Sequence, residues 1–599
     1  MPRTPQRRRL PRFLLCAAIF LLPAALLKLR AAPQQNTAPL QITTRLVEVS
    51  VVVSDHHGRP VPDLKEEDFK IFDDGVAQGI SDFEVEQRGP AVPASSLPPN
   101  MFTNVPERTT SVTPEVTVIL LDGLNTQWTD QAQSAQQIIK FLRQLKPGDR
   151  LGLYALGRQL VMLHDFTSDS AALVQALTHY NGRANSEVSS SQADNPNNPP
   201  VWTDVVGQLS NGASNAPSEA VTSAIQNWLS RTVNLESQYY MNQRVQITKA
   251  AFVAIANHLR GVPGRKNLIW VSSAFPLLKG IDQVEQSGDF SFVTAYDSAI
   301  AESAQALSDA NLAVYPVDAR GLMPNPNDVI QTGPTTAGMY ARAKKPQLPS
   351  RLPENFGAMD QIAQRTGGRA FYNSNDIQGS IRQVIDDSRL SYLLGYYPEG
   401  TDWNGKFHKI KVVVDQPGLR LEYRDGYFAI PAAAAAAPVQ TAKQALDEAA
   451  LSPLDATGIG LVVRTGPGTP ASGGAQNISL QYWIDPHGVT LAPVNQPPSG
   501  EKKWSVHITL VTIQFGPQGQ SVDGSSHDFT LQVNATQRKN LLTSGFVFGA
   551  PLAIVPGAER LRVIVRDDPT GSLGSVNIPL DRVLPRPADN TITSSPPSH

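Results

Sequence analysis

Residues 116–126 have the sequence VTVILLDGLNT, and this stretch decides the fold. Apart from one threonine, the residues before Asp122 are β-branched or aliphatic. A strand without a polar face is typical of a parallel sheet that helices cover on both sides. The pattern over Asp130–Leu145 predicts a helix after this strand. Ligands of such sheets bind at the carboxyl ends of the strands, where Asp122, Asn125 and Thr126 are expected to emerge.

Strands and helices are expected to alternate from this point to residue 395. Further strands are predicted at Arg150–Leu156, Gln159–His164, Lys266–Ser272, Leu312–Val317 and Arg369–Tyr372. Helices are predicted at Ser170–His179, Val245–Leu259, Ala299–Ala310, Phe356–Arg365 and Ile377–Ser391. Thr167 or Ser168 is expected to cap the helix that begins at Ser170. The alternation predicts a doubly wound α/β domain over residues 115–395 with right-handed crossovers. Residues 181–243 are polar and interrupt this domain as an insertion.

Segments rich in predicted strands flank the α/β domain. Alternating apolar residues predict an N-terminal β module at residues 40–89, followed by a proline-rich linker at 90–114. A β element is predicted at residues 396–430 and an Ala/Pro-rich linker with a short helix at 431–455. Five strand-like segments separated by turns predict a C-terminal β-sandwich at residues 456–584. The last segment, 585–599, is expected to be disordered.

The N-terminus predicts an exported protein. A basic start precedes the apolar run Phe13–Leu27, and small residues follow at Ala31-Ala32. This run has the length of a signal peptide and is shorter than the roughly 20 residues that a membrane-spanning helix needs. Residues 1–32 are therefore expected to be a signal peptide or an uncleaved N-terminal anchor. The expected location is the periplasm, the outer envelope or the medium.

Composition excludes some functional classes. The net charge is −2 with 17% charged residues, so no basic surface suggests nucleic acid as a partner. The only cysteine, Cys16, lies in the apolar N-terminal run. A chain cleaved after this run would contain neither disulfides nor a thiol nucleophile.

Several stretches, taken together and in order, resemble a known family. These stretches are VVVSDHHGRPVPDLKEEDFKIFDDG, VTVILLDGLNT, RKNLIWVSSAFP, LAVYPVDARGL, TGGRAFYNSND and SYLLGYYPEGTDWNGKFHKIKVVV with the later YRDGYFA. On them, residues 115–395 resemble a von Willebrand factor A (vWA) domain, and residues 44–429 resemble the VWFA-related exported proteins that are abundant in acidobacteria.

The resemblance implies a metal-dependent adhesion site in a degenerate form. The family's Asp-x-Ser-x-Ser motif holds Mg²⁺ through oxygen ligands, and the aligned residues here are Asp122, Leu124 and Thr126. Leucine offers no ligand, and a serine pair, Ser272-Ser273, stands where a further aspartate is usual. Asn125 could add an amide oxygen. The expected site is therefore Asp122, Asn125, Thr126, Ser272 and Ser273, with at most weak binding of Mg²⁺ or another divalent cation.

A purely structural role for these residues is the alternative to metal binding. On this interpretation Asp122 and Thr126 hold the loop and cap the following helix, and they hydrogen-bond Ser272. The sequence analysis leaves both interpretations open.

No catalytic motif is evident in the sequence. The pattern Gly-x-Ser-x-Gly is absent, and the histidines have no metal-ligand spacing. Asp73-Asp74 and Asp386-Asp387 are adjacent carboxylates, which are expected to face different ways along a strand or helix. Asp318 at a strand end is better placed for general acid–base chemistry than these pairs, and the alternative is that it orients a turn with Arg320.

We therefore expect a non-enzymatic protein that mediates protein–protein or adhesive binding at the cell envelope. A hydrolase whose site is not visible in the sequence is one alternative. A structural envelope scaffold is the other, with Tyr239-Tyr240 and the tryptophans of the insertion at its contact surface. The sequence does not identify the protein or envelope ligand.

Overall fold

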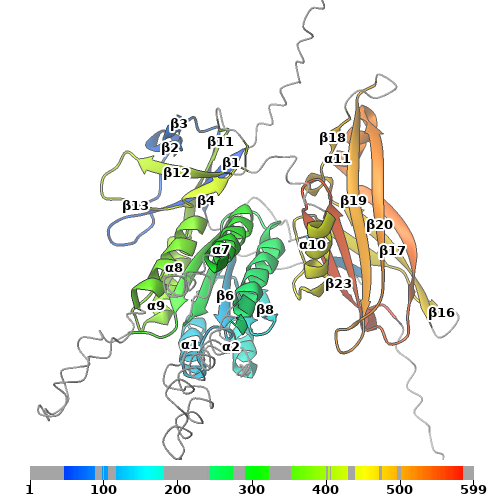
Figure 1. The fold of residues 1–599 in the computed structure, drawn as a ribbon, viewed down its shortest axis with the longest axis horizontal. Coiled ribbons are helices and arrows are strands. Elements are labelled where there is room, and N and C mark those ends of the chain that lie inside the picture. Colours follow the sequence, from blue (N-terminus) through cyan, green and yellow to red (C-terminus); the bar gives the residue numbers. More distant parts are fainter. Residues whose placement is uncertain are drawn as a thin grey trace, which may run out of the picture. The chain divides into compact units, whose positions relative to one another are not determined.

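The computed structural model describes most of the chain between residues 46 and 584 (Figure 1). The described residues are 46–87, 98, 100–105, 116–146, 148–180, 239–240, 242–273, 291–322, 352–398, 403–404, 406–429, 439–470, 475–494 and 501–584. The predicted signal peptide or anchor, most of the 181–243 insertion and the 585–599 tail lie outside them. Within the described ranges, no helix is long and apolar enough to cross a membrane.

A five-stranded sheet forms the centre of the α/β domain, with the order β10-β9-β6-β7-β8. The strands are β6 (Val116–Asp122), β7 (Leu151–Leu156), β8 (Leu160–Thr167), β9 (Lys266–Ser272) and β10 (Leu312–Asp318). Strand β6 lies in the middle and pairs in parallel with both β7 and β9. The edge strand β8 runs antiparallel to β7. The predicted mixed α/β architecture is therefore confirmed.

Helices cover both faces of this sheet (Figure 1). They are α1 (Trp128–Leu142), α2 (Ser170–His179), a helix over residues 242–259, α7 (Ser291–Asp309), α8 (Leu352–Thr366) and α9 (Ile377–Asp387). Alternate residues of β6 enter two different cores. Val118 and Leu120 pack with the 242–259 helix and with α7 and α8, whereas Ile119 and Leu121 pack with α1, α2 and α9. This two-sided burial explains the unbroken apolar sequence of β6.

Strands from both sides of the α/β domain form one β module. Its two sheets have the orders β13-β1-β11-β4 and β14-β12-β2-β3 and share one apolar core. The strands are β1 (Val47–Ser54), β2 (Phe69–Asp73), β3 (Val76–Gln78), β4 (Asp82–Gln87), β11 (Leu390–Tyr396), β12 (Phe407–Val414), β13 (Arg420–Glu422) and β14 (Gly426–Phe428), with a short 3-10 helix at Glu66–Asp68. The segments predicted separately at 40–89 and 396–430 thus pair with each other.

The C-terminal strands form two further sheets around a shared core. One contains β5 (Met101–Thr103), β15 (Leu461–Thr465), β16 (Thr469–Pro470), β17 (Gln476–Ile484) and β21 (Phe546–Ile554). The other contains β18 (Ala492–Pro493), β19 (Lys503–Phe515), β20 (Ser521–Asn534), β22 (Arg560–Asp567) and β23 (Leu573–Pro579). Helices α10 (Val439–Leu451) and α11 (Ala535–Ser544) and 3-10 turns at Pro486–Gly488 and Leu580–Arg582 complete this part.

Three local predictions are wrong. The predicted linker at 90–114 contains β5, which pairs with β15. The predicted strand at Arg369–Tyr372 is reduced to a single bridge between Phe371 and Val317. Asp169, not Thr167 or Ser168, caps α2, because its carboxylate accepts the free N–H groups of the first helical turn.

Two glycines, Gly367 and Gly368, end α8. Gly367 has φ +82°, a left-handed conformation that glycine adopts without a steric penalty. Its N–H donates to the carbonyl of Gln364 at 3.3 Å, and the N–H of Gly368 donates to that of Ala363 at 2.8 Å. This bond pattern is a Schellman motif, which satisfies carbonyls that the helix leaves free. Gly368 also lies against the backbone of β10, where an added Cβ would collide with the carbonyl oxygen of Val314.

We therefore predict that Gly368→Ala lowers the free energy of unfolding by about 1–3 kcal/mol, since β10 must move to make room. Urea denaturation followed by circular dichroism measures the change. The control is Gly79→Ala, where a Cβ would meet nothing within 4 Å. We expect its effect to be below about 0.5 kcal/mol. Equal effects in the two variants would contradict the close packing of Gly368.

Candidate functional site

The predicted site lies where β6 and β9 end side by side. Asp122 is the last residue of β6 and Ser272 the last of β9, and the two strands pair in parallel up to Leu121 and Val271. Along the chain, β7 follows on one side of β6 and β9 joins on the other. This change of side makes a topological switch point, the position at which α/β sheets commonly bind ligands.

The carboxylate of Asp122 is buried and receives hydrogen bonds from the protein itself. Its Oδ1 accepts the backbone N–H of Asn125 at 3.0 Å. Its Oδ2 accepts the Asn125 side-chain amide at 2.8 Å and the indole N–H of Trp270 at 2.9 Å. The side chain of Ser272 also hydrogen-bonds this carboxylate. Every oxygen of Asp122 therefore already has a donor.

Burial raises the pKa of Asp122 above its usual value. The hydrogen bonds from Asn125, Trp270 and Ser272 act in the opposite direction and offset part of this effect. A buried carboxylate is costly unless donors surround it. These donors therefore stabilise the buried carboxylate at the end of β6.

A second set of bonds fastens the loop after β6 to β9. The backbone N–H of Ser273 donates to Thr126 Oγ1 at 3.1 Å. Ser273 Oγ donates to the carbonyl of Asn125 at 3.3 Å and accepts the N–H of Gln127 at 3.3 Å. Gln131 of α1 donates to the carbonyls of Gly123 and Thr126, at 3.1 and 2.7 Å. The five predicted site residues thus lie in one connected cluster.

The structural interpretation of the sequence expected Asp122 and Thr126 to cap the following helix. Thr126 does not do so. Helix α1 begins at Trp128, and its N-cap residue Gln127 makes no side-chain capping bond. Leu124, which aligns with a missing ligand, is fully buried in the core on one face of the sheet. The loop therefore directs this residue into the protein interior.

The cluster does not fit Mg²⁺ in this arrangement. A hard cation takes six or more oxygen ligands, whereas the oxygens of Asp122 face N–H donors. Thr126 Oγ1 accepts a backbone N–H. Asn125 Oδ1 is buried without a hydrogen-bond partner, and one such oxygen does not make a coordination sphere. The weak metal binding suggested by the sequence stays a prediction.

A small cavity of about 80 Å³ adjoins the cluster. Its lining is mostly apolar and includes Leu121, Asp122, Gly123, Thr126, Trp128, Gln131, Ala132, Ser134, Ala135, Tyr180 and Val271. Trp128 is 55% exposed, which is unusual for so large an apolar side chain. Burial raises the pKa of Tyr180, and the charge of Asp122 adds to the shift. The strand ends therefore present an apolar surface beside a closed polar cluster.

The sequence pattern does not mark Gln131, Trp270 or Thr248, which also hydrogen-bond the cluster. Trp270 was interpreted only as part of a buried strand, although a buried indole N–H needs an acceptor. Thr248 accepts the Asn125 amide at 3.2 Å from the helix over residues 242–259. Asp318 pairs with the Arg320 guanidinium at 2.7 Å and accepts the Arg320 backbone N–H at 3.0 Å, the bonds expected of the turn-orienting alternative.

Comparisons with protein-family models and with curated proteins find no match. Solved structures with some similarity to this chain include the following three. An aerotolerance-related membrane protein from Bacteroides fragilis is 14% identical, with 45% of this chain and 98% of that chain covered and a TM-score of 0.22. A von Willebrand factor type A protein from Catenulispora acidiphila is 9% identical, with 58% and 73% covered and a TM-score of 0.22. The pilus tip protein Mfa5 from Porphyromonas gingivalis, as its three N-terminal domains, is 9% identical, with 85% and 97% covered and a TM-score of 0.23. TM-scores this low establish neither family nor function for this chain.

We predict that Asp122→Ala lowers the free energy of unfolding by about 2–5 kcal/mol, because it leaves the buried donors of Trp270 and Asn125 without an acceptor. Urea denaturation of the full chain measures the loss. Asp415→Ala is the control, since Asp415 pairs with Lys70 at 2.7 Å on the surface. Its cost is expected to be below about 1 kcal/mol. An Asp122 variant as stable as this control would contradict the assigned network.

Proposed function

We propose that this chain is an exported, non-enzymatic vWA-like protein of the acidobacterial VWFA-related type, which binds a protein ligand at the cell envelope. The observation that carries the proposal is the contrast at the strand ends. The polar residues of the degenerate adhesion site bind one another, while Trp128 stays exposed beside the adjoining cavity. Recognition on this proposal is apolar and needs no metal ion.

Three further features support the proposal. The central sheet has its switch point at β6 and β9, where the resemblance to vWA domains places ligand recognition. Tryptophan is one of the residues enriched among those that dominate binding energy at protein interfaces. The basic and apolar N-terminal sequence is typical of export.

The alternatives predict different results. A hydrolase would turn over a substrate, and the carboxyl ends of β6 and β9 would then hold reactants in place of a protein ligand. A structural scaffold would associate with the envelope without a separable ligand. Both are distinguished from the proposed binding protein by the following experiment.

We predict that immobilised full-length protein retains a defined set of proteins from an envelope extract of the producing cells, equally in EDTA and in Mg²⁺. Trp128→Ala should reduce this retention at least about tenfold, because truncated tryptophan contacts of this kind typically cost 2 kcal/mol or more. Quantitative mass spectrometry of the eluates measures the change.

Tyr397→Ala serves as the matched control, because this aromatic side chain is 46% exposed in the β module. It should retain the same proteins as the unmodified chain. Retention that needs Mg²⁺, or that survives Trp128→Ala, would contradict apolar recognition at the strand ends. Turnover of chromogenic ester, peptide or glycoside substrates would favour the hydrolase instead.

A further inference from the structure

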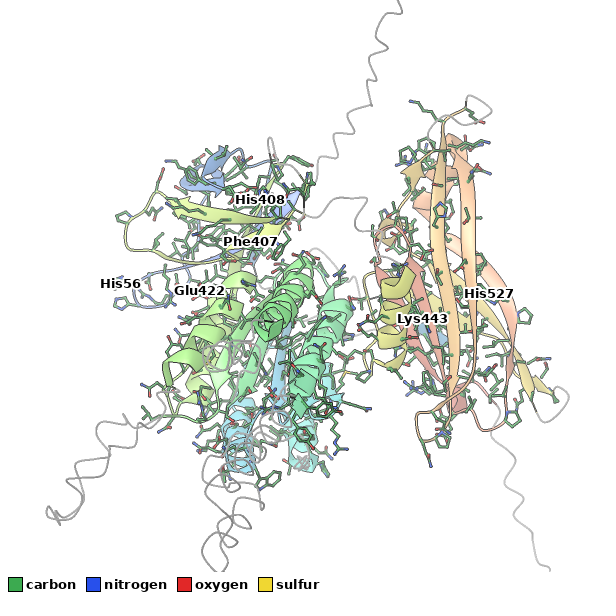
Figure 2. The ribbon with its side chains drawn as sticks, viewed as in Figure 1. His56, Phe407, His408, Glu422, Lys443 and His527 are labelled. Carbon is green, nitrogen blue, oxygen red and sulfur yellow. The ribbon has the colours of Figure 1, made fainter. Side chains whose placement is uncertain are left out.

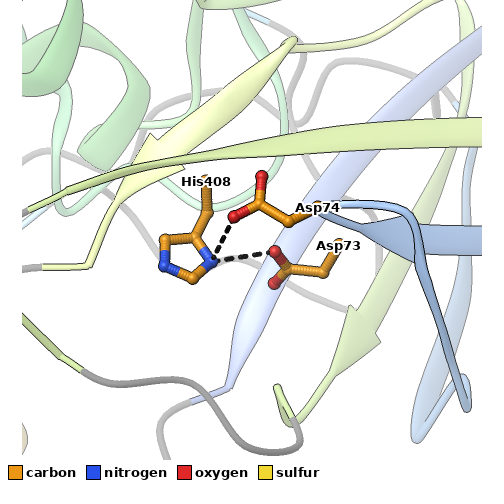
Figure 3. Close-up of side chains that lie close together, drawn as sticks. All are labelled: Asp73, Asp74 and His408. Atoms are coloured by element: carbon orange, nitrogen blue, oxygen red, sulfur yellow. Dashed lines mark hydrogen bonds and ion pairs between the residues drawn. The ribbon is translucent and has the colours of Figure 1, made fainter.

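Two carboxylates and one imidazole converge in the β module, far from the switch point in sequence. Figure 3 shows that Nδ1 of His408 faces Asp73 and Asp74 together. It lies 3.0 Å from Asp73 Oδ1 and 3.4 Å from Asp74 Oδ2. The three potential ligand atoms lie within 4.8 Å of one another. His408, which Figure 2 labels, is the second residue of β12.

Turn geometry brings the adjacent aspartates together. Asp73 ends β2 and pairs with Val76 of β3, so Asp74 and Gly75 form a two-residue turn. Both have positive φ, +46° and +84°, as hairpin turns of type I′ require. Because Asp74 has left the strand, strand alternation no longer applies to it. The prediction that these two carboxylates face different ways is therefore wrong.

Each carboxylate is oriented by hydrogen bonds to its other oxygen. Asp73 Oδ2 accepts the hydroxyls of Tyr396 at 3.0 Å and Tyr427 at 2.8 Å. Asp74 Oδ1 accepts the backbone N–H of Lys409 at 2.8 Å. The oxygens left over are the two that face His408. Carboxylates that bind metal ions are commonly held in this way by an outer shell of donors.

Charge and distance favour an ion between the three groups. The single N–H of Nδ1 can point at only one of two carboxylate oxygens, and a protonated imidazole balances only one of two negative charges. A divalent cation with a neutral imidazole would balance both. In a tetrahedral site, ligand atoms about 2.0–2.2 Å from one ion are separated by roughly 3.3–3.6 Å. The distance of 3.4 Å from Nδ1 to Asp74 Oδ2 lies in this range. The distance of 3.0 Å to Asp73 Oδ1 is shorter, so these two side chains must move apart slightly when the ion binds.

We propose that Asp73, Asp74 and His408 bind a divalent transition-metal ion, for which Zn²⁺ is the probe. The ligands are Asp73 Oδ1, Asp74 Oδ2 and His408 Nδ1, a mixed oxygen and nitrogen set that suits Zn²⁺ or Mn²⁺ better than Mg²⁺. The side chains of Asp74 and His408 are 52% and 14% exposed, so the ion is reached from solvent and water completes its coordination.

The bound ion stabilises the module by joining two distant parts of the chain. Asp73 and His408 are 335 residues apart in sequence and meet only in the folded state. An ion that binds the folded state and not the unfolded chain raises the melting temperature, by an amount that grows with the logarithm of its concentration over Kd. The inferred role is therefore a structural clip between the β2–β3 hairpin and β12.

The test is a titration of the full chain with Zn²⁺ in competition with a chromophoric chelator. We expect one site that His408→Gln and Asp74→Asn each weaken at least about tenfold. Asparagine tolerates the positive φ of residue 74, so Asp74→Asn keeps the turn. Thermal melts of the same proteins should show a Zn²⁺-dependent rise that both variants lose, and circular dichroism without metal establishes that they fold.

His487→Gln is the matched control, because His487 Nδ1 lies 2.8 Å from Asp485 Oδ1, with one carboxylate in place of two. A second control is the double change His56→Gln and His57→Gln, which removes the exposed neighbouring histidines. Neither control should change the affinity. Undiminished Zn²⁺ binding in His408→Gln and Asp74→Asn, no binding by the unmodified chain, or a loss caused by a control would overturn the proposal and leave a hydrogen-bonded ion pair.

Discussion

The buried carboxylate of Asp122 is the constraint on which the centre of the structure depends. It ends a strand that is buried along its whole length, and it is tolerated there because Asn125, Trp270 and Ser272 hydrogen-bond it. These bonds tie the loop after β6 to the end of β9. The same donors occupy the oxygens that a metal-dependent adhesion site would present to an ion. One side chain thus links the stability of the sheet to its proposed mode of recognition.

Much of the fold was predictable, because periodicity is a local signal. The apolar run before Asp122 and the alternating helices led to the mixed α/β domain, which is confirmed. Pairing between distant segments was not predictable. Strand β1 pairs with β11, and β5 pairs with β15, across separations of hundreds of residues. A local sequence pattern does not determine which strand a segment pairs with. The sequence therefore predicted two separate β segments where the structure has one module, and a linker where it has β5.

The sequence predicted which residues form the candidate site, but it did not predict the hydrogen bonds between them. Asp122, Asn125, Thr126, Ser272 and Ser273 do meet, because the ends of adjacent parallel strands lie at one edge of the sheet. Whether their oxygens face an ion or one another depends on side-chain conformations that the sequence does not reveal. The convergence of Asp74 with Asp73 was missed for a similar reason, since it depends on a positive φ in one turn residue.

The most direct test of the central claim is a thermal melt of the full chain in EDTA and in millimolar Mg²⁺, beside Asp122→Ala. An ion that binds only the folded state must raise the melting temperature as its concentration exceeds Kd. The account predicts the same melting temperature in both solutions, because protein donors occupy the carboxylate. A rise with Mg²⁺ that Asp122→Ala abolishes would contradict it and restore a functioning adhesion site. A rise that persists in Asp122→Ala would come from binding elsewhere in the chain.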